Sequence, residues 1–78
     1  MEEKKISLSE FVRQKRKSLR MTQKEMSEKS GVGIRFIREL ERGKETLKMD
    51  KVNQVLDLFG FELGPIESTK VNRSNEES

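Results

Sequence analysis

Three arginines and a glutamate are spaced so that one face of an α-helix would carry them all. Arg35, Arg38 and Arg42 stand three and four residues apart, and Glu39 lies between them. A guanidinium holds five N–H donors in a rigid fork, which matches the oxygens of a phosphate and the acceptor edge of guanine. This face therefore suits contact with nucleic acid. The competing interpretation is an ordinary surface helix, in which Arg35 and Glu39 form an ion pair across one turn.

These side chains need a helix that hides its other face. Phe36, Ile37 and Leu40 fall on the side opposite the arginines, at a spacing that lets them pack inward. We expect this helix to span residues 34–42 and to end at Gly43, because glycine readily adopts the left-handed conformation that follows a helix. One face would then be buried while the charged face stays open to a ligand.

A preceding helix must hold this one in place. The stretch Thr22-Gln23-Lys24-Glu25 is a capping box and predicts a helix over residues 23–29, which Gly31 ends. Met26 would point inward, and Val32 would fill the turn between the two helices. Two short helices joined by so few residues are typical of a helix-turn-helix, in which one helix crosses the DNA backbone and the next enters the major groove.

Two further helices complete an expected all-α bundle of four to five short helices. The first follows another capping-box pattern at residues 7–10 and spans residues 8–19. The last spans residues 49–58 and ends at Gly60. The apolar residues of these two helices recur at helical spacing and would face the core: Leu8, Phe11, Val12, Leu19, Val52, Val55, Leu56 and Phe59.

The segment after the last helix predicts a short strand over residues 61–66. Phe61-Glu62-Leu63 alternates apolar and polar side chains, and Pro65 limits the length of the strand. A lone strand cannot satisfy its own backbone groups, so we expect antiparallel pairing with the same strand of a second subunit. The alternative is an irregular coil packed on its own subunit. The expected interface of this homodimer consists of Phe59, Phe61, Leu63 and Ile66.

The charges are unevenly distributed along the chain. Residues 9–44 carry 11 basic and 5 acidic side chains, whereas residues 45–66 carry 2 basic and 4 acidic ones. A cationic block of this kind is typical of a phosphate-binding surface, although a solvated helical surface can have the same composition.

The residue types that are missing exclude most enzyme chemistry. The chain contains no Cys, His or Tyr, so the usual nucleophiles, general bases and metal ligands are absent. We expect neither catalysis, nor a cofactor, nor a metal site. No run of 18 apolar residues occurs and no apolar segment follows residues 1–5, so we expect a cytoplasmic protein without membrane contact. With 78 residues, we expect one domain over residues 7–60, between a frayed start at 1–6 and a disordered polar tail at 67–78.

One set of residues in this domain forms a pattern by residue type and spacing: Arg16, Thr22-Gln23, Met26, Ser27, Gly31-Val32, Ile37, Leu40-Glu41 and Gly43. Over residues 8–60 this pattern resembles the helix-turn-helix domain of phage repressors and Xre-type bacterial regulators. The chain departs from the family at Ser27, where a small Ala is usual, and at Ser30, where an apolar residue is common.

The resemblance implies a lambda-repressor-like fold and a bacterial repressor that binds a palindromic operator in double-stranded DNA. The positions that would read bases are Ile34, Arg35, Arg38 and Glu39, and those that would bind phosphates are Thr22, Gln23, Lys24, Arg42 and Lys44. Arg16 and Glu41 would form a structural ion pair between the first and third helices. The alternatives are that Gln23 only favours its helix, that Ile34 belongs to the core, that Lys44 is a solvated loop residue, and that Arg16 and Glu41 are separate surface charges.

The end of the domain adds a more specific likeness. The run Leu-Phe-Gly-Phe-Glu-Leu at residues 58–63, followed by a polar tail, resembles HipB-type antitoxins. That likeness implies an antitoxin that represses its own operon and binds a HipA-like kinase toxin, with the terminal strands pairing between subunits. The alternatives are a stand-alone repressor of a phage or mobile element, and a protein-interaction module that does not bind DNA.

Overall fold

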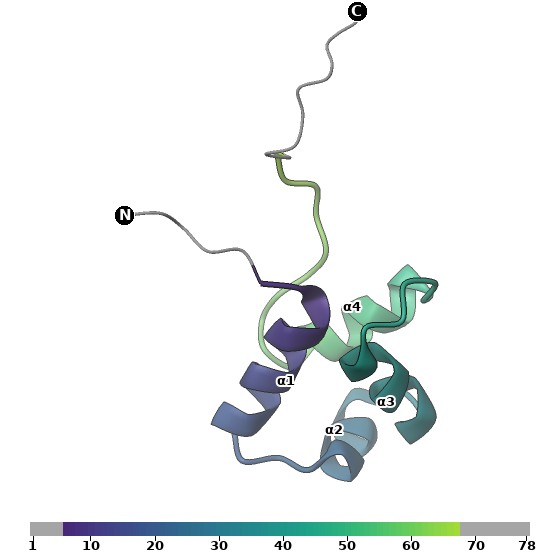
Figure 1. Cartoon of the computed structure of the whole chain (residues 1–78). Helices are drawn as coiled ribbons and strands as arrows, with labels where there is room; N and C mark the ends of the chain where they lie inside the picture. Colours follow the sequence, from purple (N-terminus) through teal and green to yellow (C-terminus); the bar gives the residue numbers. More distant parts are fainter. Residues whose placement is uncertain (1–5, 68–78) are drawn as a thin grey trace, which may run out of the picture.

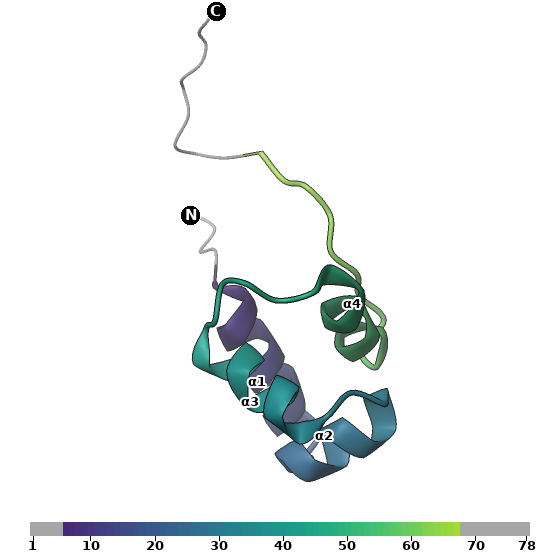
Figure 2. The ribbon, with the colours of Figure 1, turned by 90° about the vertical axis from the view of Figure 1, so that its right-hand side faces the viewer.

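The computed structural model describes residues 6–67, which form four short α-helices (Figure 1). These are α1 (Leu8–Ser18), α2 (Gln23–Ser30), α3 (Ile34–Arg42) and α4 (Met49–Asp57). Helix α3 packs against α1 and α2, and α2 also packs against α4. Figure 2 shows α1 and α3 side by side, with α4 across the bundle from them. The all-α prediction is confirmed for this part of the chain, with four helices.

The helix ends follow local signals in the sequence. At the start of α2, Thr22 Oγ1 accepts from the Glu25 N–H at 3.0 Å, and the Thr22 N–H donates to Glu25 Oε1 at 2.8 Å. At the start of α1, Ser7 Oγ accepts from the Glu10 N–H at 3.2 Å. Gly31 ends α2 with a φ of 84°, a left-handed conformation that other residues rarely adopt. The predicted caps therefore place these boundaries to within one residue.

The predicted inward position of Leu19 is wrong. Helix α1 ends at Ser18, so helical spacing no longer sets the direction of the next side chain, and Leu19 is 54% exposed. Arg20 follows with a φ of 57°, and the Met21 N–H bonds back to the Arg16 carbonyl at 3.0 Å. This turn brings Met21 against the core where Leu19 was expected.

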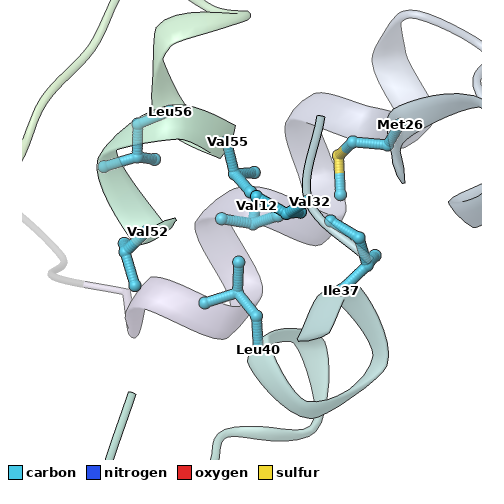
Figure 3. Close-up of a cluster of buried hydrophobic side chains, with 8 residues drawn as sticks. All are labelled: Val12, Met26, Val32, Ile37, Leu40, Val52, Val55 and Leu56. Atoms are coloured by element: carbon cyan, nitrogen blue, oxygen red, sulfur yellow. The ribbon is translucent and has the colours of Figure 1, made fainter. Parts of the chain in front are cut away.

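Every helix contributes to one small apolar core (Figure 3). Ile37 and Leu40 of α3 are fully buried, and Val32 fills the α2–α3 turn as expected. Burial of apolar side chains is the main favourable contribution to folding, so this cluster fixes which face of α3 points inward. The buried side chains are Val12, Met26, Val32, Ile37, Leu40, Val52, Val55 and Leu56.

The segment after α4 forms no strand in the single chain. The prediction of a strand over residues 61–66 is therefore wrong for the isolated subunit. A lone strand has no neighbour for its backbone groups, and the segment packs on its own subunit as far as Leu63. The Phe61 ring meets Phe11 edge-on, with centroids 4.9 Å apart. The Leu63 N–H donates to Asn53 Oδ1 at 2.7 Å. Beyond this point the segment leaves the bundle (Figure 1).

Two sequence predictions concern the ends of the chain. The frayed start falls almost entirely on residues 1–5 and the disordered tail on residues 68–78, and both stretches lie outside the described residues. Within residues 6–67, no helix is long and apolar enough to cross a membrane.

Candidate nucleic-acid interface

The outer face of α3 carries the arginines that the sequence placed there. Arg35, Arg38 and Arg42 are exposed, while Ile37 and Leu40 on the same helix are fully buried. Because the core anchors the apolar stripe, these arginines lie on the solvent side of α3. Among residues 6–67, none of these three arginines has a carboxylate within 4 Å.

The glutamate on this face pairs with the following loop rather than with Arg35. Glu39 Oε1 lies 3.4 Å from Lys44 Nζ, and the Lys44 N–H donates to the Glu39 carbonyl at 3.1 Å. The ordinary-helix interpretation predicted an Arg35–Glu39 pair, and that pair is absent from the part of the chain that the structure describes. Ile34, at the start of α3, is half-buried and lies outside the buried core cluster.

A buried carboxylate joins the three helices behind this face. The Glu41 side chain is 5% exposed. Arg16 donates two hydrogen bonds to its carboxylate, from Nε to Oε2 at 2.7 Å and from Nη2 to Oε1 at 3.0 Å. Gln23 Nε2 donates to Oε1 at 3.1 Å. Arg16 Nη1 also donates to the Met21 carbonyl at 2.9 Å. Residues from α1, α2 and α3 therefore meet at one charged group.

The electrostatics of this joint favour the ionised pair. Burial alone would raise the pKa of the Glu41 carboxyl. The hydrogen bonds from Arg16 and Gln23 and the positive charges of Arg16 and Arg13 outweigh burial, so the pKa of Glu41 is lowered. The hydrogen bond to Glu41 raises the pKa of Arg16 against the opposing effect of burial.

The residues predicted to bind phosphates lie at the start of α2 and at the end of α3. Thr22 and Lys24 are exposed, and Gln23 is half-buried with its amide bonded to Glu41. Arg42 and Lys44 are exposed around the C-terminal end of α3. The Gln23–Glu41 bond brings these two groups of residues onto neighbouring parts of the surface.

Sequence reasoning missed Arg13 on α1. Its Nη1 donates to the Glu41 backbone carbonyl at 2.8 Å, so it adds a second link between α1 and α3. A signal was present, because Arg13 and Arg16 are three residues apart and share a helix face. That spacing did not reveal which carbonyl the guanidinium would reach.

The comparison with known families agrees with this arrangement of helices. A family model described as "Helix-turn-helix" matches residues 12–66, which include α2, the turn and α3. The chain belongs to the helix-turn-helix family. The resemblance to Xre-type regulators is thereby confirmed.

The name of one relative of this helix-turn-helix protein agrees with the family. The chain is 46% identical over 50 residues to an uncharacterized HTH-type transcriptional regulator of Sinorhizobium fredii (strain NGR234). The match covers 64% of this chain and 66% of the relative, which is just under two thirds of that protein. No solved structure matches the chain.

Proposed function

We propose that this helix-turn-helix protein is a transcriptional repressor that binds a specific operator in double-stranded DNA through α3. The observation that carries the proposal is the amphipathic packing of α3, with Ile37 and Leu40 fully buried and three exposed arginines that have no carboxylate within 4 Å among residues 6–67. A helix held by its apolar stripe can enter the major groove with its charged ridge first. The family and the name of the relative support the same function.

The base-reading role falls to the first part of the ridge. Arg35 and Arg38 can each offer a fork of donors to O6 and N7 of guanine. Ile34, which stays partly accessible, can contact a thymine methyl group. Glu39 can accept from cytosine, although its bond with Lys44 must then be exchanged for a base contact.

The phosphate-binding role falls to the residues around this ridge. Thr22, Gln23 and Lys24 lie at the start of α2, where the helix dipole favours an anion and the N–H groups of Gln23 and Lys24 donate to no atom of residues 6–67. Arg42 and Lys44 lie at the other end of α3. In this proposal the two groups contact the DNA backbone and fix the orientation of α3 in the groove.

The test is a gel shift of the full chain with its own promoter, measured over a salt series and against random duplex of equal length. We expect tighter binding to the promoter and a steep loss of affinity with salt, because bound phosphates release counterions. Equal affinity for both duplexes would contradict an operator-specific repressor. No binding to either duplex would favour a protein-interaction module.

The homodimer is a second part of the proposal, and the backbone after α4 supports it. In an extended segment, alternate residues direct their N–H groups to opposite edges. The N–H groups of Phe61 and Leu63 are bonded within the chain, and Pro65 on the same edge has none. The N–H groups of Glu62, Gly64 and Ile66 donate to no atom of residues 6–67, and in an extended conformation they would lie on one open edge.

This open edge fits a second copy of itself. Antiparallel pairing about a two-fold axis at Gly64 would place Glu62 of one subunit opposite Ile66 of the other, each donating to the other's carbonyl. The expected interface residues are accessible in the single chain: Phe61 is 45% and Ile66 74% exposed, and Phe59 and Leu63 are half-buried. A dimer would place two copies of α3 in successive major grooves of a palindrome.

Analytical ultracentrifugation tests the dimer. Gly64→Pro removes the N–H group at the proposed axis, so it should shift the chain from dimer to monomer, whereas Glu62→Ala keeps its N–H group and should not. A wild-type chain that sediments only as a 9.1 kDa species at micromolar concentration would contradict the dimer.

The antitoxin role is the most specific part of the proposal, and it depends on the likeness of residues 58–63 to HipB-type antitoxins. The partner would be a HipA-like kinase toxin. Co-expression with the product of the adjacent gene and purification of the complex tests this role. A neighbouring gene that encodes no toxin-like kinase would instead favour a stand-alone repressor of a phage or mobile element.

A further inference from the structure

A hollow of about 420 Å³ lies where α1, α2 and α3 meet, beside the arginine-bearing face of α3. Glu41 is its buried member, and Arg16 from α1 and Gln23 from α2, both half-buried, bond to the Glu41 carboxylate. Four more cationic side chains complete the lining: Arg13 and Lys17 from α1, and Arg38 and Arg42 from α3. Figure 2 shows how α1 and α3 lie alongside each other here.

The charges of this hollow are not balanced by the protein. Glu41 is the only carboxylate in the lining, and Arg16 and Gln23 already occupy both of its oxygens. Among residues 6–67, Arg13, Lys17, Arg38 and Arg42 have no carboxylate within 4 Å. Arg13 bonds to the Glu41 carbonyl through Nη1 alone, which leaves its other N–H groups available. Four like charges around one concavity repel one another, and a bound anion would relieve that repulsion.

We propose that this hollow is a phosphate seat, which binds one phosphodiester of the DNA backbone through Arg13 and Lys17 together with Arg38 and Arg42. The inference rests on the proposed DNA-binding function and extends the binding surface from α2 and α3 to α1. Guanidinium groups bind phosphate oxygens through paired, charge-assisted hydrogen bonds, and an ammonium adds a compact positive charge. The carboxylate of Glu41 does not oppose the anion, because Arg16 neutralises it.

This seat gives Arg38 a second kind of contact. Arg38 is one of the proposed base-reading residues and also lines the hollow, so it can bind a phosphate while Arg35 remains on the base edges. The DNA backbone would then pass along the cleft between α1 and α3. The orientation of α3 in the groove would depend on α1 as well as on the start of α2.

The experiment measures duplex affinity of Lys17→Gln over a salt series, with the promoter and with random duplex. The Lys17 side chain is exposed and makes no hydrogen bond or ion pair with any atom of residues 6–67, so the variant should remain folded, and thermal melting checks this. Lys29→Gln is the matched control, because it removes the same charge from the exposed end of α2, away from the hollow. Loss of one phosphate contact should weaken binding to both duplexes about fivefold at about 0.15 M salt and reduce the salt slope by about one.

Arg13→Lys provides a second variant, which keeps the positive charge but removes the paired N–H donors of the guanidinium. It should weaken binding less than Arg13→Gln does and leave promoter preference unchanged. If wild-type chain binds the promoter specifically and the Lys17 and Arg13 variants match Lys29→Gln in affinity and salt slope, the phosphate seat is wrong while the proposed function stands. If wild-type chain binds no duplex, both proposals fail.

Titration with inorganic phosphate separates a DNA backbone site from a site for a free anion. Side-chain NMR signals of Arg13 and Arg38 should shift on addition of duplex at micromolar concentration and respond to inorganic phosphate only in the millimolar range. Saturation by inorganic phosphate at micromolar concentration, with no effect of Lys17→Gln on duplex binding, would overturn the assignment to the DNA backbone.

Discussion

Two arginines of this chain show how burial decides what a guanidinium does. Arg16 is 13% exposed and donates hydrogen bonds to the Glu41 carboxylate and to the Met21 carbonyl. Arg35 is exposed and has no carboxylate partner among residues 6–67. The first group stabilises the fold, and the second is available to a ligand. A substitution should therefore affect stability at Arg16 and recognition at Arg35.

Arg35→Ala should weaken operator binding by about 1–3 kcal/mol and relax the base preference at one position, because it removes a fork that reads guanine. Binding to random duplex should change little. Competition gel shifts with single-base operator variants measure both effects. An equal loss on operator and random duplex would show that Arg35 contacts a phosphate instead.

Lys44→Ala should behave in the opposite way and weaken all duplexes alike, because an exposed ammonium beside the end of α3 can exchange its pair with Glu39 for a phosphate. The salt slope should fall by about one. The Glu39 pair that it also removes is an exposed one and contributes little to stability. A change in base preference would show that Lys44, or Glu39 through it, takes part in readout.

Glu41→Gln should lower the free energy of unfolding by about 3 kcal/mol at neutral pH, because it leaves the Arg16 charge buried without its partner. The pKa of Glu41 is lowered in the folded state. Its ionised form therefore contributes stability above the ordinary Glu pKa of about 4.3, and this contribution is lost as pH falls through the folded pKa. Urea unfolding of the wild-type chain and of Glu41→Gln, from neutral to acidic pH, measures this contribution to stability.

The two unfolding curves should approach each other as the solution becomes acidic. Glu39→Gln serves as the control, because its pair with Lys44 is exposed and should be worth less than about 1 kcal/mol at any pH. A constant difference between wild type and Glu41→Gln down to acidic pH would show that the ionised pair does not account for the loss.

At the scale of the helices, boundaries set by local chemistry were readable from the sequence. The capping box at Thr22 and the glycine at the end of α2 act over a few residues, so their pattern was sufficient. Leu19 was not readable, because the turn that ends α1 one residue earlier follows no capping pattern in the sequence. The strand over residues 61–66 was not readable, because it depends on contacts with distant parts of the chain. The arginine ridge followed from helical periodicity, whereas the Arg13 contact needed the placement of α1 on α3.

Gly31→Ala should destabilise the fold by about 1–2 kcal/mol, because an L-residue is strained at a φ of 84°. The added Cβ would also lie 3.4 Å from Gln54 Nε2, which bonds to the Ser30 carbonyl. Gly33→Ser is the control, since Gly33 has a φ of −69° and open space around it. Chemical denaturation compares them, and equal stability of the two variants would contradict the strain.

At the scale of the whole molecule, the C-terminal segment connects the subunit body to the proposed dimer. Phe61 packs on Phe11, and Lys15 Nζ lies 5.2 Å from the Phe61 ring centroid and 5.7 Å from that of Phe11. Such cation–ring contacts and the edge-on ring pair are each worth about 1 kcal/mol. They hold the start of the segment on α1 and leave Gly64 and Ile66 clear of the bundle.

Phe61→Ala should therefore act on the subunit and on the dimer to different extents. It should lower the free energy of unfolding of the subunit by about 1 kcal/mol, because the ring is already 45% exposed. It should raise the dimer dissociation constant by about tenfold or more, since a large aromatic side chain is lost from a small interface. Sedimentation over a concentration series measures the dissociation constant, with Glu62→Ala as the control. An unchanged constant would place Phe61 outside the interface.

The joint at Glu41 has a consequence for how such a regulator can be controlled. Side chains from α1, α2 and α3 converge on one carboxylate, so the recognition helix has no hinge of its own within the subunit. An effector cannot tilt α3 without breaking a buried charged contact. In the proposed dimer, control would then come from a change in the distance or the angle between two subunits that each stay rigid.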